Sequence, residues 1–149
     1  MRRVLVLGAA ACVASCTFTT ATGFTECDTD VSCDKAHPKQ DHACIEKFCI
    51  KLTDNCRRQT GEFSSANRVV FAATLPLTST PDSGVVDQSE QQGLNALSLA
   101  VDEGNQREGI KGTRFALLFC NTGGDDTLAK AQVEWLGTQL KVPAVGTSG

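Results

Sequence analysis

The chain lacks a long hydrophobic run, an excess of basic side chains and more than two histidines. No stretch approaches the roughly 20 apolar residues of a membrane-spanning helix, so no transmembrane segment is expected. The 14 basic residues are outnumbered by 17 acidic ones, which gives no basic footprint for nucleic acid. With 41% hydrophobic and 21% charged residues, the composition is that of a folded chain rather than a disordered one.

Eight cysteines are present, and all but one lie before residue 57. The first segment begins with Arg2 and Arg3 and continues as an apolar run over 4–14, as in a secretory signal peptide. The run ends in VASC and resembles the lipobox of bacterial lipoproteins, which implies a signal peptide over 1–15 and lipidation, including palmitate, at Cys16. A buried strand of a cytosolic protein is the alternative.

The lipobox resemblance also implies a place in the cell. A Cys16 that carries two or more acyl chains would anchor the chain stably to a membrane of the cell envelope. Thr17 follows it, where many lipoproteins retained in the inner membrane have aspartate, so the outer membrane is the expected site. Residues 16–25 carry no charge and no helical or strand-like pattern, and we interpret them as a tether.

Residues 26–58 form a cysteine-rich module with few large apolar side chains, so disulfides are needed to stabilise it. Six cysteines fall outside the signal and the lipidation position, an even number that favours disulfides in an exported chain. Sequence alone does not choose the connectivity; one economical arrangement has two bridges within the module and a third from Cys56 to Cys120. A zinc site is the rival interpretation, with Cys33, His37, His42 and Cys44. The six candidates for disulfides are Cys27, Cys33, Cys44, Cys49, Cys56 and Cys120.

After a polar boundary at 58–67, residues 67–149 show an α/β pattern. Apolar runs predict buried strands at 68–75, 113–120 and from 141. Helices are predicted from near Asp87 to Gly104 and over 125–140. The order β-α-β-α-β predicts a partial, parallel, three-layer sheet with loops 77–84, 121–125 and 147–149 at one edge. The expected inward residues are Leu94, Leu97 and Val101 in the first helix and Ala129, Val133, Leu136 and Leu140 in the second, with Trp135 in the core.

Enzyme chemistry finds little support in the sequence. Neither glycine-rich phosphate-binding pattern follows a strand, and the G-x-S-x-G spacing is not met near Ser148. Both histidines lie in the cysteine-rich module, away from any nucleophile in the α/β part. The pairs Asp102–Glu103 and Asp125–Asp126 are better explained as solvated faces or helix caps. We therefore expect no enzyme activity, no cofactor and no metal.

Six short segments resemble, in order and spacing, the opening of the type I periplasmic binding proteins of the branched-chain amino-acid group. They are LPLT at 75–78, QG at 92–93, LAVDEGN at 99–105, EGIKG at 108–112, CNTGGD at 120–125 and VPAVG at 142–146. The resemblance implies a non-enzymatic receptor in which two α/β lobes close on a solute. It also implies that this chain holds only the first part of one lobe, and that such a fragment binds no solute tightly alone.

The implied ligand is an amino acid or a similar small polar solute, and the implied partner is an ABC permease or a sensing system. A hydroxyl-bearing loop after the third strand would hold the carboxylate of the ligand, in line with the general affinity of strand-to-helix turns for anions. The alternative function is that of a surface-anchored, cysteine-rich interaction lipoprotein with the α/β part as a scaffold. The candidate ligand-binding residues are Ser79, Thr80, Asn121, Thr147 and Ser148.

Overall fold

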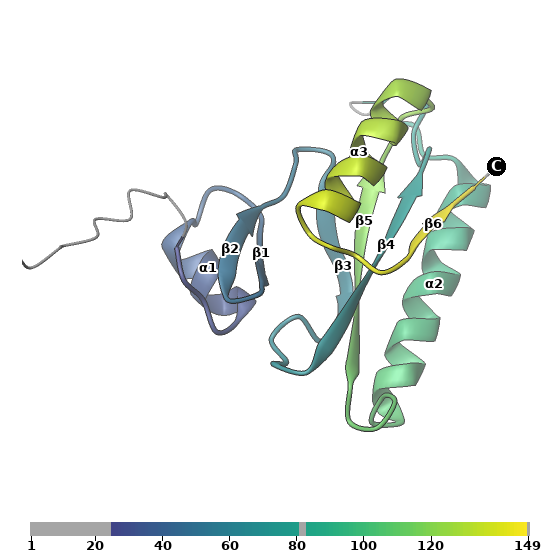
Figure 1. Ribbon diagram of the computed structural model, residues 1–149. Helices are drawn as coiled ribbons and strands as arrows, with labels where there is room; N and C mark the ends of the chain where they lie inside the picture. The colour runs from purple at the N-terminus through teal and green to yellow at the C-terminus, as the bar shows by residue number, and fades with distance from the viewer. Residues whose placement is uncertain (1–24, 81–82, 149) are drawn as a thin grey trace, which may run out of the picture.

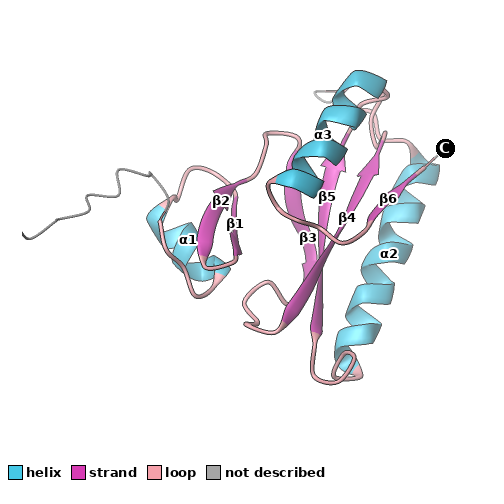
Figure 2. Ribbon diagram, in the orientation of Figure 1, coloured by secondary structure: helices cyan, strands magenta, loops and turns pink. Residues whose placement is uncertain are grey.

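A computed structural model describes residues 25–80 and 83–148 (Figures 1 and 2). The expected signal peptide at 1–15, the lipidation position Cys16 and all but the last residue of the tether lie outside the described residues. The described chain is a mixed α/β structure with a small disulfide-rich module at one side of a mixed sheet.

The module consists of one short helix and one hairpin. Helix α1 (Asp30–Ala36) precedes the antiparallel strands β1 (His42–Ile45) and β2 (Phe48–Lys51). The two turn residues, Glu46 and Lys47, have φ values of 49° and 71°. Positive φ at both positions suits the tight turn whose twist matches that of the flanking strands. Neither the helix nor the hairpin was predicted from the sequence.

Three disulfides join the six cysteines that the sequence analysis proposed: Cys27–Cys44, Cys33–Cys49 and Cys56–Cys120. The first two lie within the module and fix its N-terminal segment and α1 to the hairpin. The third connects the end of the module to the α/β part, as the economical arrangement had predicted. The zinc interpretation is wrong for this oxidised structure, because Cys33 and Cys44 each form a disulfide and are not available as thiolate ligands.

The main sheet contains four strands in the order β3-β5-β4-β6. Its parallel part, β4 (Arg68–Leu75), β5 (Arg114–Asn121) and β6 (Val145–Thr147), confirms the predicted β-α-β-α-β order. The edge strand β3 (Cys56–Gly61) was not predicted, and it runs antiparallel to β5. It occupies part of the segment that we had interpreted as a boundary.

Strand β3 consists mainly of polar residues. Its backbone and its long side chains, rather than apolar burial, hold it to the sheet. Apart from Cys56, none of its residues is fully buried. The Arg57 guanidinium carbon lies 5.2 Å from the centre of the Phe119 ring, and Thr60 Oγ1 donates to Asp102 Oδ1 at 2.6 Å. A strand held in this way lacks the apolar pattern by which buried strands are recognised in sequence.

The helices α2 (Gln88–Gln106) and α3 (Asp126–Thr138) lie on opposite faces of the sheet. Residues of β5 alternate accordingly: Leu117 and Phe119 pack with α2, whereas Ala116 and Leu118 face the side of α3. The start of α2 near Asp87 is confirmed, since the Asp87 side chain accepts hydrogen bonds from the amides of Ser89 and Glu90.

Helix α2 continues past the stop predicted at Gly104. A Cβ at Gly104 would lie 3.0 Å from Phe115 Cδ2, so glycine allows the helix to approach β5 closely. The Asn105 side chain then accepts from the Phe115 amide at 2.7 Å and donates to the Phe115 carbonyl at 2.8 Å. These contacts fix the end of the helix to the sheet.

Two of the predictions for the inner helix faces are wrong. Leu97 and Val133 are 39% and 38% exposed. In α3 the inward position is taken by Gln132, which is buried and donates from Nε2 to the Asn121 carbonyl at 3.0 Å. Val133, the next residue, therefore does not occupy the inward position, while Trp135 packs partly buried against the core, as expected.

The module and the sheet share one hydrophobic core. Ala43 and Leu52 of the module belong to the same buried cluster as Leu118 of β5 and Leu136 of α3. Arg58 of β3 donates to Asp34 of α1 at 2.7 Å, which adds an ion pair across the junction. The cysteine-rich module is therefore part of the folded unit that the sheet forms.

We predict that the bridge between β3 and β5 stabilises the fold more than either bridge inside the module. It closes 64 residues, against 16 for Cys33–Cys49. From loop-closure entropy, the variant Cys56→Ala/Cys120→Ala should lose about 4 kcal/mol of unfolding free energy, and Cys33→Ala/Cys49→Ala about 3 kcal/mol. Urea denaturation followed by Trp135 fluorescence measures both values. An equal or reversed order would contradict the prediction.

Candidate functional site

The carboxyl ends of the three parallel strands lie together at one edge of the sheet (Figure 1). Leu75 at the end of β4 is paired with Asn121 of β5, and Thr74 is paired with Thr147 of β6. The loops that follow these strands therefore meet, as the predicted parallel order requires.

Asn121 connects the first two of these loops. Its Nδ2 donates to Thr78 Oγ1 at 2.7 Å, and its Oδ1 accepts from the Gly123 amide at 3.1 Å. The Asn121 side chain is half-buried and is occupied by contacts within the protein. Through these contacts, Asn121 holds the two loops in place.

Ser79 and Thr80 lie on the exposed side of the loop after β4. Ser79 Oγ donates to Ser83 Oγ at 3.3 Å, and the Thr80 carbonyl accepts a short hydrogen bond from Thr78 Oγ1. Neither residue lines the hollow that contains Thr147 and Ser148. The hollow thus includes two of the five candidate ligand-binding residues, Thr147 and Ser148, and its lining does not include the other three.

The hollow beside Thr147 and Ser148 has a volume of about 450 Å³. It lies between the ends of β4 and β6 and the first turns of α3, and Thr74 and Thr122 contribute hydroxyl groups to its lining. Its charged residues, which the sequence analysis had not assigned to a site, are Asp125, Asp126, Lys130 and Glu134. The sequence pointed toward them only by placing loop 121–125 at this edge, and it explained Asp125 and Asp126 as a solvated face or a helix cap.

Asp125 is the N-cap of α3, and only one of its two carboxylate oxygens caps the helix. Oδ1 accepts from the amides of Thr127 and Leu128 at 2.7 and 3.1 Å. The carboxylate thereby already compensates the positive end of the helix dipole. The hollow therefore combines hydroxyl donors and one lysine with three carboxylates, a set that can contact both ends of a zwitterion.

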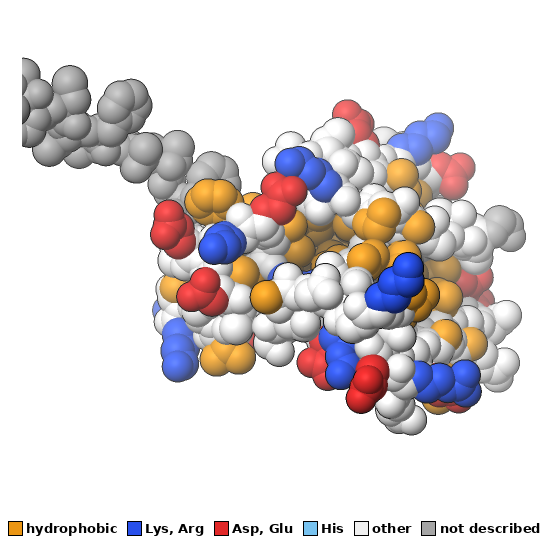
Figure 3. Space-filling model, turned by 60° about the horizontal axis from the view of Figure 1, so that its bottom comes forward, with side chains coloured by type: hydrophobic (Ala, Val, Ile, Leu, Met, Phe, Trp, Pro, Cys, Tyr) orange, Lys and Arg blue, Asp and Glu red, His pale blue; other side chains and the backbone are white. Residues whose placement is uncertain are grey.

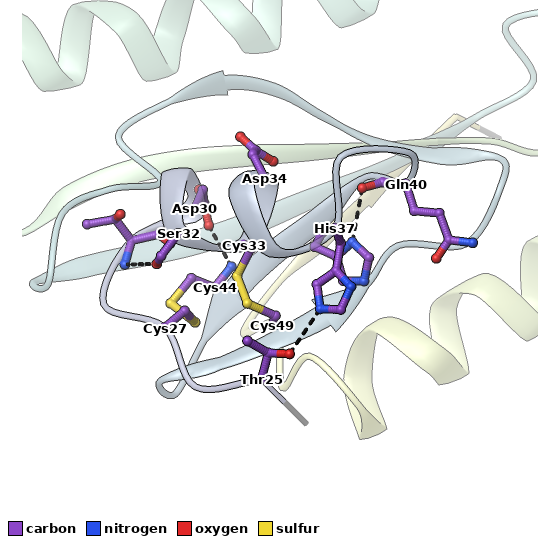
Figure 4. Close-up of a disulfide and its surroundings, with 12 residues drawn as sticks. Thr25, Cys27, Asp30, Ser32, Cys33, Asp34, His37, Gln40, Cys44 and Cys49 are labelled. Atoms are coloured by element: carbon purple, nitrogen blue, oxygen red, sulfur yellow. Dashed lines mark hydrogen bonds between the residues drawn. A yellow bond between two sulfur atoms is a disulfide. The ribbon is translucent and has the colours of Figure 1, made fainter. Parts of the chain in front are cut away.

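The cysteine-rich module contains a second group of polar side chains around its disulfides (Figure 4). The imidazole rings of His37 and His42 stack, with centroids 4.1 Å apart. His37 Nε2 lies 3.1 Å from Thr25 Oγ1, and His42 Nδ1 lies 3.0 Å from the Gln40 carbonyl. The two rings thus pack against each other, each with a partner inside the module.

Asp30 is the buried charge of the module. Its Oδ1 accepts from the Cys44 amide at 2.5 Å, while its Oδ2 has no hydrogen-bond partner and lies 3.9 Å from Arg58 Nη1. Burial raises the pKa of Asp30 above 3.8, although the Cys44 amide and the nearby Arg68 and Arg58 act in the opposite direction. The cost of removing the carboxylate from water exceeds these favourable contacts.

Comparison with family models, curated proteins and solved structures finds no match for this chain. Among the described residues, none of the helices α1, α2 and α3 has the length and apolarity that crossing a bilayer requires.

The raised pKa of Asp30 predicts a specific pH dependence of stability. The folded state binds the Asp30 proton more tightly than the unfolded state, so this contribution is complete below about 3.8 and is lost as the pH rises through the folded-state pKa. The unfolding free energy of the wild type minus that of Asp30→Asn should therefore fall as the pH rises and then level off. Urea denaturation at a series of pH values measures this difference. A difference that grows with pH would mean that the arginines and the Cys44 amide outweigh burial.

Proposed function

We propose that this protein is an extracytoplasmic solute-binding lipoprotein of the branched-chain amino-acid receptor type, used in ABC transport or in sensing. The α/β part supplies the first part of a lobe, and lipidated Cys16 anchors the chain to the cell envelope. The observation that carries the proposal is the meeting of three polar loops at the carboxyl edge of β4, β5 and β6. In open α/β sheets this edge is where ligands bind.

The chemistry of the hollow at this edge supports an amino acid or a similar zwitterion as the solute. Thr147 and Ser148 lie at the exposed end of β6, where their hydroxyl groups can donate to a carboxylate. Lys130 can contribute a positive charge to the carboxylate, and Asp125 and Asp126 can accept from an ammonium group. A neutral or purely anionic solute would offer these carboxylates no ammonium group.

Binding to a single lobe should be weak. In the receptors that the sequence resembles, a second lobe closes over the solute and removes it from water, and this closure strengthens each polar contact. The hollow described here contacts a ligand from one side only. We therefore expect millimolar affinity for the chain itself, with transport or sensing dependent on a closing partner surface.

The test is a titration of the oxidised, isotope-labelled chain with leucine, followed by amide chemical shifts. We expect saturable shifts at Thr122, Thr147 and Ser148, weakened several-fold in Thr147→Val, because a charge-assisted hydrogen bond is lost. Leucinamide, which lacks the carboxylate, should bind more weakly to the wild type.

Thr138→Val is the matched control, since it removes an exposed hydroxyl at the far end of α3 whose hydrogen bond is to the Glu134 carbonyl. It should bind leucine as the wild type does. Shifts confined to other surfaces, or equal losses in both valine variants, would exclude a solute site at this edge. Micromolar binding would refute the expectation that one lobe is insufficient.

A further inference from the structure

A second hollow lies at the opposite edge of the sheet, between the module and the start of β4. Its volume is about 610 Å³, within the roughly 300–1,000 Å³ of small-molecule sites. The module contributes its hairpin and the Cys27–Cys44 bridge, β4 contributes its first residues, and the segment between α3 and β6 closes the third side.

The walls of this junction hollow are largely apolar. Ile45 comes from the hairpin, Val70 from β4, and Leu140 and Pro143 from the segment after α3. Figure 3, in which this edge is turned forward, shows hydrophobic side chains gathered between the module and the α/β part. Such walls favour the hydrocarbon part of a ligand, because its burial removes apolar surface from water.

Arg68 is the charged residue of β4 in the lining of the hollow. Its Nη1 donates to the Ser65 carbonyl at 2.6 Å, but its Nε is buried and has no hydrogen-bond partner. Among the described residues, no carboxylate lies within ion-pair distance of Arg68. Burial lowers the pKa of this guanidinium, and the negative charge of Asp30 only partly opposes the effect.

The other charged residues of the lining do not cancel the positive charge of Arg68. Lys141 and Glu46 form an exposed ion pair, with 3.0 Å between Nζ and Oε2. Lys47 and Asp28 remain, with charges of opposite sign. A single negative charge on the ligand would therefore complement Arg68, which among the described residues has no carboxylate within ion-pair distance.

We infer that the junction hollow is a second binding site, specific for a small apolar molecule that carries one carboxylate. The hydrocarbon part lies against Ile45, Val70 and Leu140, and the carboxylate lies beside the Arg68 guanidinium. This site is separate from the solute site proposed above, since the two occupy opposite edges of the sheet.

The test is a titration of the oxidised chain with octanoate and, in parallel, with octanamide, which has the same alkyl chain and no charge. Amide chemical shifts locate the binding and give both dissociation constants. We expect octanoate to shift the amides of Ile45, Val69 and Val70 and to bind roughly tenfold or more tightly than octanamide, as a charge-assisted contact requires. Equal affinities, or shifts elsewhere, would overturn the inference.

Arg68→Gln should weaken octanoate binding roughly tenfold or more and leave octanamide binding unchanged. Arg107→Gln, which removes an exposed arginine after the end of α2, is the matched control and should bind both ligands as the wild type does. An Arg68→Gln variant that binds octanoate normally would contradict the site.

Asp28→Asn tests the same site without altering a buried group, so it decides the matter even if Arg68→Gln does not fold. The removal of a carboxylate from the lining should tighten octanoate binding and leave octanamide binding unchanged, with a larger difference at low salt. Unchanged octanoate binding in this variant would count against placing the octanoate carboxylate in the junction hollow.

Discussion

The bond between Cys56 and Cys120 determines how the two parts of this protein are joined. It connects the first residue of β3 to a residue near the end of β5, the inner strand beside it. The module directly precedes Cys56, so the bond holds the module against the face of the sheet on which α3 lies. Ala43 and Leu52 then complete a core with Leu118 that neither part could bury alone. The arrangement replaces the large core that a short cysteine-rich segment lacks.

The parallel order of β4, β5 and β6 makes the two edges of the sheet chemically different. At the carboxyl edge, loops of small hydroxyl and amide residues meet acidic groups at the start of α3 around an open hollow. At the other edge the module covers the beginning of β4 and encloses apolar side chains around Arg68. A polar solute suits the first edge and an apolar anion the second.

Much of the α/β part was predictable, because its signals are local. The apolar run at 68–75 marks β4, and Asp87 marks the start of α2. The even number of cysteines favoured disulfides, and the third bridge was one arrangement among those that the sequence left open. Strand β3 was not predicted, because its polar residues join the sheet through backbone hydrogen bonds. The inward position of Gln132 was not predicted, because its hydrogen-bond partner is a backbone carbonyl. The hollow around Arg68 could not be predicted, since it joins segments far apart in sequence.

The central claim is that the module and the sheet form one cooperative unit. Native-state hydrogen exchange tests it most directly, through the amide of Cys44, which donates to Asp30 in the module, and that of Leu118 in the core of β5. A shared unit predicts that both amides exchange through the same global opening, with equal free energies and equal denaturant dependence. Exchange of Cys44 through a smaller, separate opening would contradict the claim.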